Sequence, residues 1–345
     1  MIDNVKLHIS GDNAKKIFHN ELLNFSIKTN IKTGEVLTIK TCNKSGTYEY
    51  ETLTYLASFK EVLTFTYKET CSTNLKAKIQ TYSTNLEING SFHKLYNHGR
   101  NDNDYTFIDF TNTVHYLSET FGFNPTCFKV QNLEFAVNIM LPINAREFIS
   151  NVVYYKNKIP DINTFGGTGY MKQFEFTQYF IKIYDKGLQN NTVTNQLRFE
   201  IKAIKNQYLK FANIRYLSDL LDSRNWQKLA KRLHDVFLEL LITEYCKKDE
   251  MKLNDRILLI NAKNSDFWHK THKRSIYSFK EKRVKFRLLK DIYGNGLQRD
   301  VAQLIQDKTI LLNNANNNIE SFNQKSLETW LKLPPVFTNI KSVHL

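Results

Sequence analysis

The chain has few cysteines, no long apolar run and comparatively little negative charge. Its four cysteines lie far apart among 345 residues, which argues against a zinc site or a disulfide framework. No apolar run reaches the length of about 18 residues that a membrane span needs, and the N-terminus lacks the basic and then apolar order of a signal peptide. We therefore expect a cytoplasmic protein with reduced cysteines.

The charge that is present is mostly positive. Forty-eight Lys and Arg residues against 34 Asp and Glu residues give a net charge of +14 and a pI near 9.4. Such an excess favours a polyanionic partner, with nucleic acid as the first candidate and a membrane surface as the second. Aromatic residues make up 13% of the chain, and single-stranded bases stack on rings that lie among cations. Most of these rings are nevertheless expected in the core, for which a hydrophobic content of 41% is sufficient.

Two stretches near the middle of the chain alternate between apolar and polar residues. Residues 179–187 read YFIKIYDKG, and residues 197–202 read LRFEIK. A period of two is typical of half-buried strands. The link at 188–195 is rich in Gln, Asn and Thr, so the two strands are predicted to pair as an antiparallel hairpin.

One face of this hairpin gathers groups that can do chemistry. Alternation puts Arg198, Glu200 and Lys202 on the same face, with Tyr184 or its neighbours close to them. A tyrosine at a strand end is most often a packing residue, and charged groups on a strand are most often solvated. The pattern alone therefore leaves a functional site and an ordinary surface both open.

A carboxylate interrupts another predicted strand. Residues 129–141 form a largely apolar run that contains Glu134. A carboxylate is costly to bury unless it is paired, protonated or bound to a cation. Glu134 therefore belongs either to a site or to the water-facing side of the strand.

The remaining patterns predict an α+β fold in which a central antiparallel sheet is flanked by helices. A β-rich portion is expected at residues 1–85, and it joins a core at 86–246 to form the first domain. After the charged residues 247–250, a basic helical region is expected at 247–345. The main helices are predicted at 107–121, 146–155, 225–246, 270–290 and 297–312. Strands are predicted at 5–10, 36–41, 48–55, 62–67, 75–82 and 86–94.

The predicted helix at 270–290 is strongly basic. Its cations include Lys282, Arg283, Lys285 and Arg287, with apolar residues between them. This composition predicts contact with DNA phosphates. Together with the helix at 297–312 it forms either a helix-turn-helix or an ordinary helical hairpin.

Several stretches resemble, in order, the filamentous-phage gene II replication initiators, members of the nickase family of phage and plasmid rolling-circle replication. The resemblance covers roughly the middle half of the chain. The matching stretches are MID at 1–3, NGSFHKLYN at 89–97, LEFAVNI at 133–139, IKIYDKG at 181–187 and QLRFEIKAIKNQYLKF at 196–211.

The resemblance implies a fold like that of the HUH (Rep) nickases and an activity that nicks one strand of supercoiled circular DNA at a replication origin. Tyr184 would be the nucleophile, forming a 5′-phosphotyrosine that conserves the energy of the broken bond. Lys186 would stabilise the phenolate or the scissile phosphate. A host polymerase would extend the 3′ end, possible partners include a host helicase, and no membrane partner is expected. The enzyme would finally close the displaced single-stranded circle.

The resemblance also implies a metal ion and further contacts to DNA. Glu134 and Glu200 would hold Mg²⁺ or Mn²⁺, which prefer oxygen ligands. His93 is a candidate third ligand, although the filamentous-phage pattern does not require a histidine there. The two-histidine metal motif of the wider superfamily is not evident. Lys94 and Arg198 would contact DNA, and Lys202 is a further candidate.

Two other hypotheses explain the same charge. One is a non-catalytic basic protein that binds single-stranded nucleic acid. The other is a metal nuclease that uses water, which would cleave DNA without forming a covalent adduct.

Overall fold

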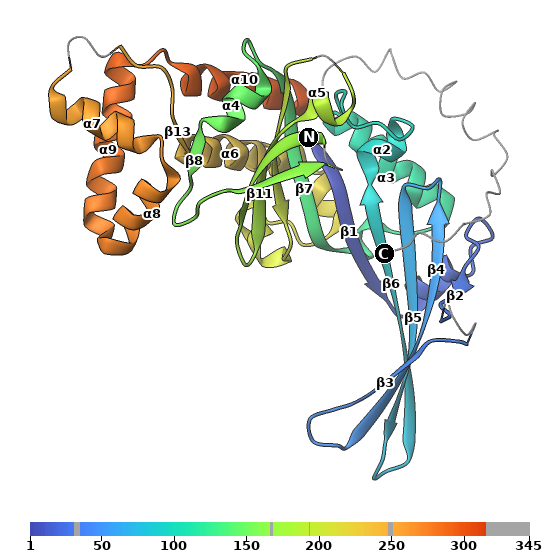
Figure 1. Cartoon of the computed structure of the whole chain (residues 1–345). Coiled ribbons are helices and arrows are strands. Elements are labelled where there is room, and N and C mark those ends of the chain that lie inside the picture. Colours follow the sequence, from blue (N-terminus) through green and yellow to red (C-terminus); the bar gives the residue numbers. More distant parts are fainter. Residues whose placement is uncertain (31–34, 166–167, 193, 248–250, 315–345) are drawn as a thin grey trace, which may run out of the picture.

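The protein is an α+β fold in which a large antiparallel sheet is flanked by helices, as the sequence predicts (Figure 1). The structure is a computed structural model and describes residues 1–30, 35–165, 168–192, 194–247 and 251–314. Part of the predicted C-terminal region, residues 248–250 and 315–345, thus lies outside the described residues. Within the described part of the chain, no helix is long and apolar enough to cross a membrane.

The main sheet has eleven strands in the order β2-β4-β5-β6-β1-β7-β12-β11-β10-β9, with β3 paired to β4. Every neighbouring pair is antiparallel. The strands are β1 (Ile2–Ser10), β2 (Ser26–Ile27), β3 (Thr38–Cys42), β4 (Tyr48–Phe59), β5 (Leu63–Asn74), β6 (Ile79–Ser91), β7 (Lys129–Met140), β9 (Asp161–Phe165), β10 (Thr168–Glu175), β11 (Tyr179–Asp185) and β12 (Gln196–Ala203). A second, two-stranded sheet pairs β8 (Val152–Tyr154) with β13 (Leu241–Ile242).

The helices connect these strands and form most of the C-terminal part. They are α1 (Asp12–Phe18), α2 (Phe92–Tyr96), α3 (Phe107–Phe121), α4 (Ala145–Ser150), α5 (Lys186–Gln189), α6 (Ser223–Glu239), α7 (Leu253–Ala262), α8 (Ser265–Arg274), α9 (Ile276–Tyr293) and α10 (Leu297–Asn313). Short 3₁₀ turns are η1 (Pro125–Cys127), η2 (Asn206–Ala212) and η3 (Leu217–Leu221).

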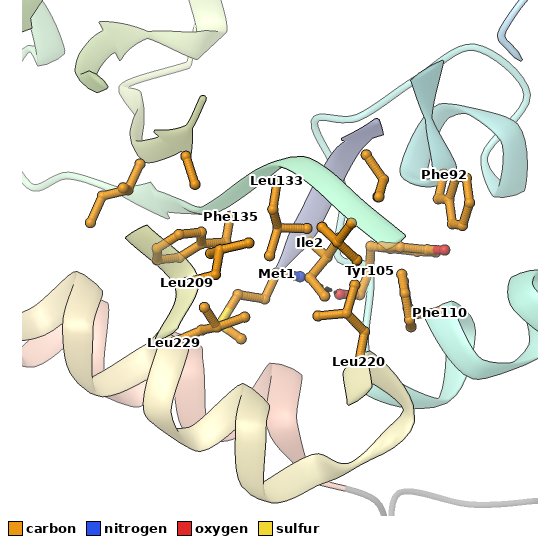
Figure 2. Close-up of a cluster of buried hydrophobic side chains, with 14 of the residues drawn as sticks. Met1, Ile2, Phe92, Tyr105, Phe110, Leu133, Phe135, Leu209, Leu220 and Leu229 are labelled. Atoms are coloured by element: carbon orange, nitrogen blue, oxygen red, sulfur yellow. Dashed lines mark hydrogen bonds between the residues drawn. The ribbon is translucent and has the colours of Figure 1, made fainter. Parts of the chain in front are cut away.

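The central strands bury their apolar face against helices. Figure 2 shows Met1 and, in β1, Ile2 gathered with Leu133 and Phe135 of β7, close to Leu229 of α6. Helix α10 contributes to the same cluster through Val301, Ala302, Ile305 and Leu312. Because strand side chains alternate between the two faces, this packing directs the polar residues of the central strands to the opposite face.

Helices α7, α8 and α9 form a lobe at one end of the molecule (Figure 1). They have an apolar cluster of their own, built around Trp268, Phe279 and Phe286 and joined by Tyr154 of β8. The helices of the predicted region 247–345 therefore do not pack as one unit. Helix α10 packs in the main core, whereas α7–α9 form the separate cluster.

Several predicted elements match the structure closely. Strands β11 and β12 form the expected antiparallel hairpin. Helix α3 spans the predicted residues 107–121, and Gly122 ends it in the left-handed conformation at φ 65°. Helix α10 spans 297–313, one residue more than predicted.

Two predicted helices are too long. The helix expected at 146–155 ends at Ser150, and the helix expected at 225–246 ends at Glu239. In both cases the apolar residues that follow form a strand, and these two strands, β8 and β13, pair with each other. The pairing is between residues about 90 positions apart, so local periodicity did not reveal it.

The basic helix expected at 270–290 is in fact two helices. Ser275 has an extended backbone at φ −161°, and its hydroxyl accepts a hydrogen bond from the amide of Ser278 at 3.2 Å. This cap ends α8 and begins α9, because a serine hydroxyl satisfies an amide that the first turn leaves without a partner.

Candidate functional site

The predicted site residues lie on the polar face of the central strands. They come from β12 and from its two neighbours, β11 and β7. Arg198 lies opposite Tyr184 of β11 and Asn138 of β7, while Glu200 lies opposite Lys182. Strand alternation then keeps these side chains on one face. The face predicted from the period of two is therefore present in the structure.

Three carboxylates converge on this face from three strands. Asp3 of β1, Glu134 of β7 and Glu200 of β12 each offer an oxygen, and these oxygens lie within 4.8 Å of one another. Asp3 and Glu200 are buried and Glu134 is half-buried. Carboxylates this close repel each other unless cations lie between them.

Arg198 is the cation at the centre of the cluster. Its guanidinium donates to Asp3 Oδ2 at 2.6 Å, to Glu200 Oε2 at 2.9 Å and to Asn138 Oδ1 at 3.2 Å. The side chain is buried, so this pairing compensates a charge that has lost its water. Although burial alone would raise the pKa of Asp3, Arg198 and hydrogen bonds from Ser91 and Asn101 lower it to about 2.

Two lysines pair with the other carboxylates. Lys182 Nζ lies 2.9 Å from Glu200 Oε1 and 3.9 Å from Glu134 Oε1, and Lys202 Nζ lies 2.7 Å from Glu134 Oε1. Burial and the charge of Glu200 raise the pKa of Glu134. Burial opposes ionisation of Glu200 as well, but Arg198 and Lys182 outweigh it and lower the pKa of Glu200.

Tyr184 lies directly beside this cluster. Its hydroxyl donates to Glu200 Oε2 at 3.4 Å, and the residue is 6% exposed. Burial raises the pKa of the phenol well above its ordinary value of 10, while Arg198 acts in the opposite direction. The phenol is therefore protonated at neutral pH in this structure.

Lys186 also lies near the tyrosine, in the first turn of α5 rather than on the strand. Its Nζ lies 5.9 Å from the centre of the Tyr184 ring and donates to Asn101 Oδ1 at 2.7 Å and to Gln189 Oε1 at 2.8 Å. Burial, with a smaller contribution from Arg198, lowers the pKa of Lys186 to about 8. This ammonium is therefore poorly hydrated and close to titration at neutral pH.

These groups line a pocket of about 690 Å³. Its wall combines the acidic residues Asp3, Glu134 and Glu200 with Tyr184 and Lys186. Lys94, which was predicted to contact DNA, is exposed at the rim. The remaining lining includes Gly99, Arg100, Asn101, Asp102, Met171, Lys182, Gln189, Asn190 and Thr192.

His93, the candidate third metal ligand, is not one of the three residues whose oxygens converge. It is buried, stacks on Tyr105 with ring centres 4.8 Å apart, and its Nε2 lies 3.0 Å from Asn103 Oδ1. Burial lowers the pKa of His93 to about 4, so the ring is neutral at neutral pH. Within the described residues, the cluster found here takes Asp3 where the sequence suggested His93.

The four predicted cations of the basic helix lie on α9, in the lobe away from the central strands (Figure 1). Lys285 pairs with Asp255 at 2.5 Å, and Arg287 donates to the carbonyl oxygens of Leu238 and Glu239. Lys282 lies over the ring of Phe267, and Arg283 lies over that of Phe279. Three of these cations thus make contacts inside the lobe and Arg287 reaches the end of α6, while the binding of all four to DNA stays a prediction.

Asp3 and the asparagines beside it were not identified as site residues from the sequence. Asp3 occurs in the MID opening, which was noted for its resemblance alone, and Asn101 lies in the loop between α2 and α3. The Asn101 side chain connects two parts of the site, since it donates to Asp3 Oδ2 at 2.7 Å and accepts from Lys186. An acidic residue between the apolar Ile2 and Val5 was the available signal for Asp3.

Comparison with known proteins leaves the function open. No protein-family model matches the chain, and no curated protein matches it. Among solved structures, a rolling circle replication initiator protein from Geobacillus stearothermophilus aligns with 11% identity and a TM-score of 0.37, over 74% of this chain and 89% of that chain. Similarity this distant carries no argument about activity.

Proposed function

We propose that the protein is a replication initiator that nicks one DNA strand through Tyr184 and later rejoins it. The observation that carries the proposal is the position of the Tyr184 hydroxyl, 3.4 Å from Glu200 at the edge of a pocket lined by three carboxylates and Lys186. The net charge of +14 supports a DNA substrate, because it attracts a polyanion.

In the nicking step the Tyr184 oxygen attacks phosphorus, forming an O–P bond while the bond from phosphorus to the 3′-oxygen breaks. The phenolic proton passes to Glu200, which already accepts the hydroxyl's hydrogen bond. Lys186 stabilises the negative charge that builds up on the phosphate, and the 3′-oxygen takes a proton from solvent as its bond to phosphorus breaks. Rejoining is the reverse reaction, with a 3′-hydroxyl attacking the phosphotyrosine.

The carboxylates fit a divalent cation in donor type and spacing. Mg²⁺ and Mn²⁺ prefer oxygen donors, and one oxygen from each of the three carboxylates lies within 4.8 Å of the others. Asp3, Glu134 and Glu200 would hold the ion. When bound it would neutralise the non-bridging oxygens of the phosphate as charge builds up there.

The positively charged ammonium of Lys182 already lies next to two of these carboxylates. Its ammonium lies between Glu134 and Glu200, at 3.9 Å and 2.9 Å. Burial opposes its charge, but the two carboxylates raise the pKa of Lys182 overall. For Glu134 and Glu200 to hold a divalent cation, Lys182 would have to move away from them, because their oxygens cannot face both cations equally.

A covalent-adduct assay tests the proposal. The protein is incubated with Mn²⁺ and a pool of random single-stranded oligonucleotides labelled at the 3′ end, then separated on a denaturing gel. The label belongs at the 3′ end because a 5′-phosphotyrosine keeps the 3′ part of the strand on the protein. We expect a labelled protein band that disappears with Tyr184→Phe and with EDTA, since each removes one component of the reaction.

Tyr179→Phe is the matched control. Tyr179 lies on the same strand, is 8% exposed against 6% for Tyr184, and its hydroxyl accepts from Lys156 at 3.2 Å. The parent band should persist in this variant. Shortened labelled DNA without labelled protein would instead identify a water-using nuclease. A complex seen only on native gels would identify a binding protein without catalysis.

A further inference from the structure

One part of the main sheet projects away from the body (Figure 1). It consists of β3 and the distal parts of β4, β5 and β6, residues 38–53 and 68–83, which we call the arm. Both of its hairpin turns, residues 43–47 and 75–78, lie at its free end, because β3 pairs with β4 and β5 pairs with β6 there.

The arm has no core of its own. All residues in 38–53 and 68–83 are described, and none of them is buried. Apolar side chains in it are open to solvent, with Ile39 at 58%, Ile79 at 59% and Tyr82 at 75% exposure. A sheet with both faces in water gains little from apolar burial, so an arm of this kind is suited to gain stability from a partner.

The free end of the arm is basic. Its two turns contain Lys44, Lys76 and Lys78 and no acidic residue. The turns are ordered rather than loose, since Asn74 Oδ1 accepts from the amides of Lys76 and Ala77, both at 3.0 Å. Nearer the body the charges are mixed, as in the pair of Lys40 with Glu51 at 3.8 Å. The positive charge of the arm is therefore concentrated at its tip.

We propose that the arm binds duplex DNA, with the tip lysines on backbone phosphates. Cationic side chains on an exposed tip can contact the phosphate backbone, and exposed hydroxyl side chains of the arm, among them Thr41 and Thr81, can donate to phosphate oxygens. Leu75, which precedes Lys76 in the second turn, is 49% exposed and adds an apolar surface to the tip. A second copy of the chain fits less well, because two tips of the same charge repel each other.

Strand β6 connects the tip to the pocket. It runs from Ile79 at the tip to Ser91, whose hydroxyl donates to Asp3. Twelve steps at roughly 3.3 Å make this distance about 40 Å, close to one turn of duplex. The arm would thus hold the duplex about one turn from the site of nicking. This placement rests on the proposed function, whereas DNA binding by the arm does not.

Binding is measured by fluorescence anisotropy with a labelled duplex of about 40 base pairs, in EDTA and over a range of salt concentrations, so that nicking plays no part. The arm variant is Lys44→Ala/Lys76→Ala/Lys78→Ala. We expect its affinity at about 0.1 M salt to fall roughly tenfold or more, and the slope of log K against log salt to decrease by about 2 to 3, since each lost phosphate contact removes about 0.9.

The matched control is Lys16→Ala/Lys129→Ala/Lys210→Ala, which removes the same charge from exposed positions on the body. It should keep the salt slope of the parent, and circular dichroism should show that both variants are folded. Equal slopes for the two variants would overturn the proposal. So would sedimentation of the parent as a dimer and of the arm variant as a monomer at equal DNA affinity, because the arm would then be a protein interface. Persistence of the covalent adduct in Tyr184→Phe would overturn the proposed function and leave this binding test unchanged.

Discussion

Arg198 connects the stability of the site to its chemistry. A buried guanidinium costs several kcal/mol unless its donors are paired, and here they reach Asp3, Glu200 and Asn138. The same contacts fix the carboxylates that we propose as metal ligands. Changing either partner of the Arg198–Asp3 pair should therefore affect folding before it affects catalysis.

Asp3→Asn tests this link through pH. The pKa of Asp3 is lowered from 3.8 to about 2, so its ionisation stabilises the fold above pH 3.8, and this contribution is lost as pH falls towards 2. The shift corresponds to about 2 kcal/mol. We expect the variant to lose about 2 to 4 kcal/mol of unfolding free energy at pH 7 in urea titrations, because Arg198 also loses a charged partner. The difference from the parent should shrink below pH 3.8.

An exposed pair provides the comparison. Asp235 pairs with Lys231 on the surface of α6 at 3.0 Å. Surface pairs contribute little to stability, so Asp235→Asn should leave the urea midpoint nearly unchanged at every pH. If Asp3→Asn behaves in the same way, the Arg198–Asp3 contact does not hold the fold together.

At the scale of single elements, the one-turn helix α5 sets the position of Lys186, its first residue. Asp185 caps it by accepting from the amide of Leu188 at 2.9 Å, and Gly187 lies against the chain that returns to β12. A Cβ at Gly187 would lie 2.1 Å from the carbonyl oxygen of Thr194, so this backbone approach requires glycine. The position of the Lys186 ammonium therefore depends on a glycine at residue 187.

Gly187→Ala should displace α5 and with it Lys186. We expect a loss of about 1 to 3 kcal/mol in unfolding free energy from overpacking, and adduct formation slowed roughly tenfold or more. Urea denaturation and the rate of appearance of the labelled band measure the two effects. Leu188→Ala is the control, because Leu188 is 40% exposed and its truncation should change neither quantity. Unchanged adduct formation in Gly187→Ala would show that Lys186 need not be held in this place.

The local pattern of apolar and polar residues predicts the strands of this site better than it predicts which distant strands pack together. The period of two placed Arg198 and Glu200 on one face with Tyr184 near them, since hairpin partners are close in sequence. Asp3 reaches Arg198 across 195 positions, and no local pattern carries that contact. The ends of α4 and α6 were predicted wrongly for the same reason, because the strands that follow them find their partners far along the chain.

At the scale of the whole molecule, one sheet carries both proposed contacts with DNA. Strands β1, β7, β11 and β12 build the pocket, and β6 continues from its edge into the arm. The α7–α9 lobe lies at another end of the molecule (Figure 1). A single DNA contacted at the arm and the pocket would thus follow the sheet, and the cations of α9 are not needed for that path.

The sequence predicts a domain boundary at residue 246. The packing of α10, which lies after this boundary, against the main core provides a test of that prediction. Val301, Ile305 and Leu312 lie in the main core, so a chain ending at residue 246 would leave α6 and β7 without this cover. Burying a large aliphatic side chain is worth about 1.5 to 3 kcal/mol, and several of them approach the whole stability of a domain. We expect the shortened chain to lack a cooperative thermal transition by circular dichroism.

A pair of point variants on α10 separates this packing effect from that of truncation. Ile305 is fully buried and Ile310 is 52% exposed on the same helix. Ile305→Ala should cost about 2 to 4 kcal/mol in urea titrations through the cavity that it leaves, and Ile310→Ala well under about 1 kcal/mol. If the chain ending at residue 246 melts cooperatively at the parent's temperature, α10 is dispensable and the predicted boundary is right. If it does not, and Ile305→Ala alone lowers stability as expected, the first domain extends through α10 and the α7–α9 lobe is an insertion within it.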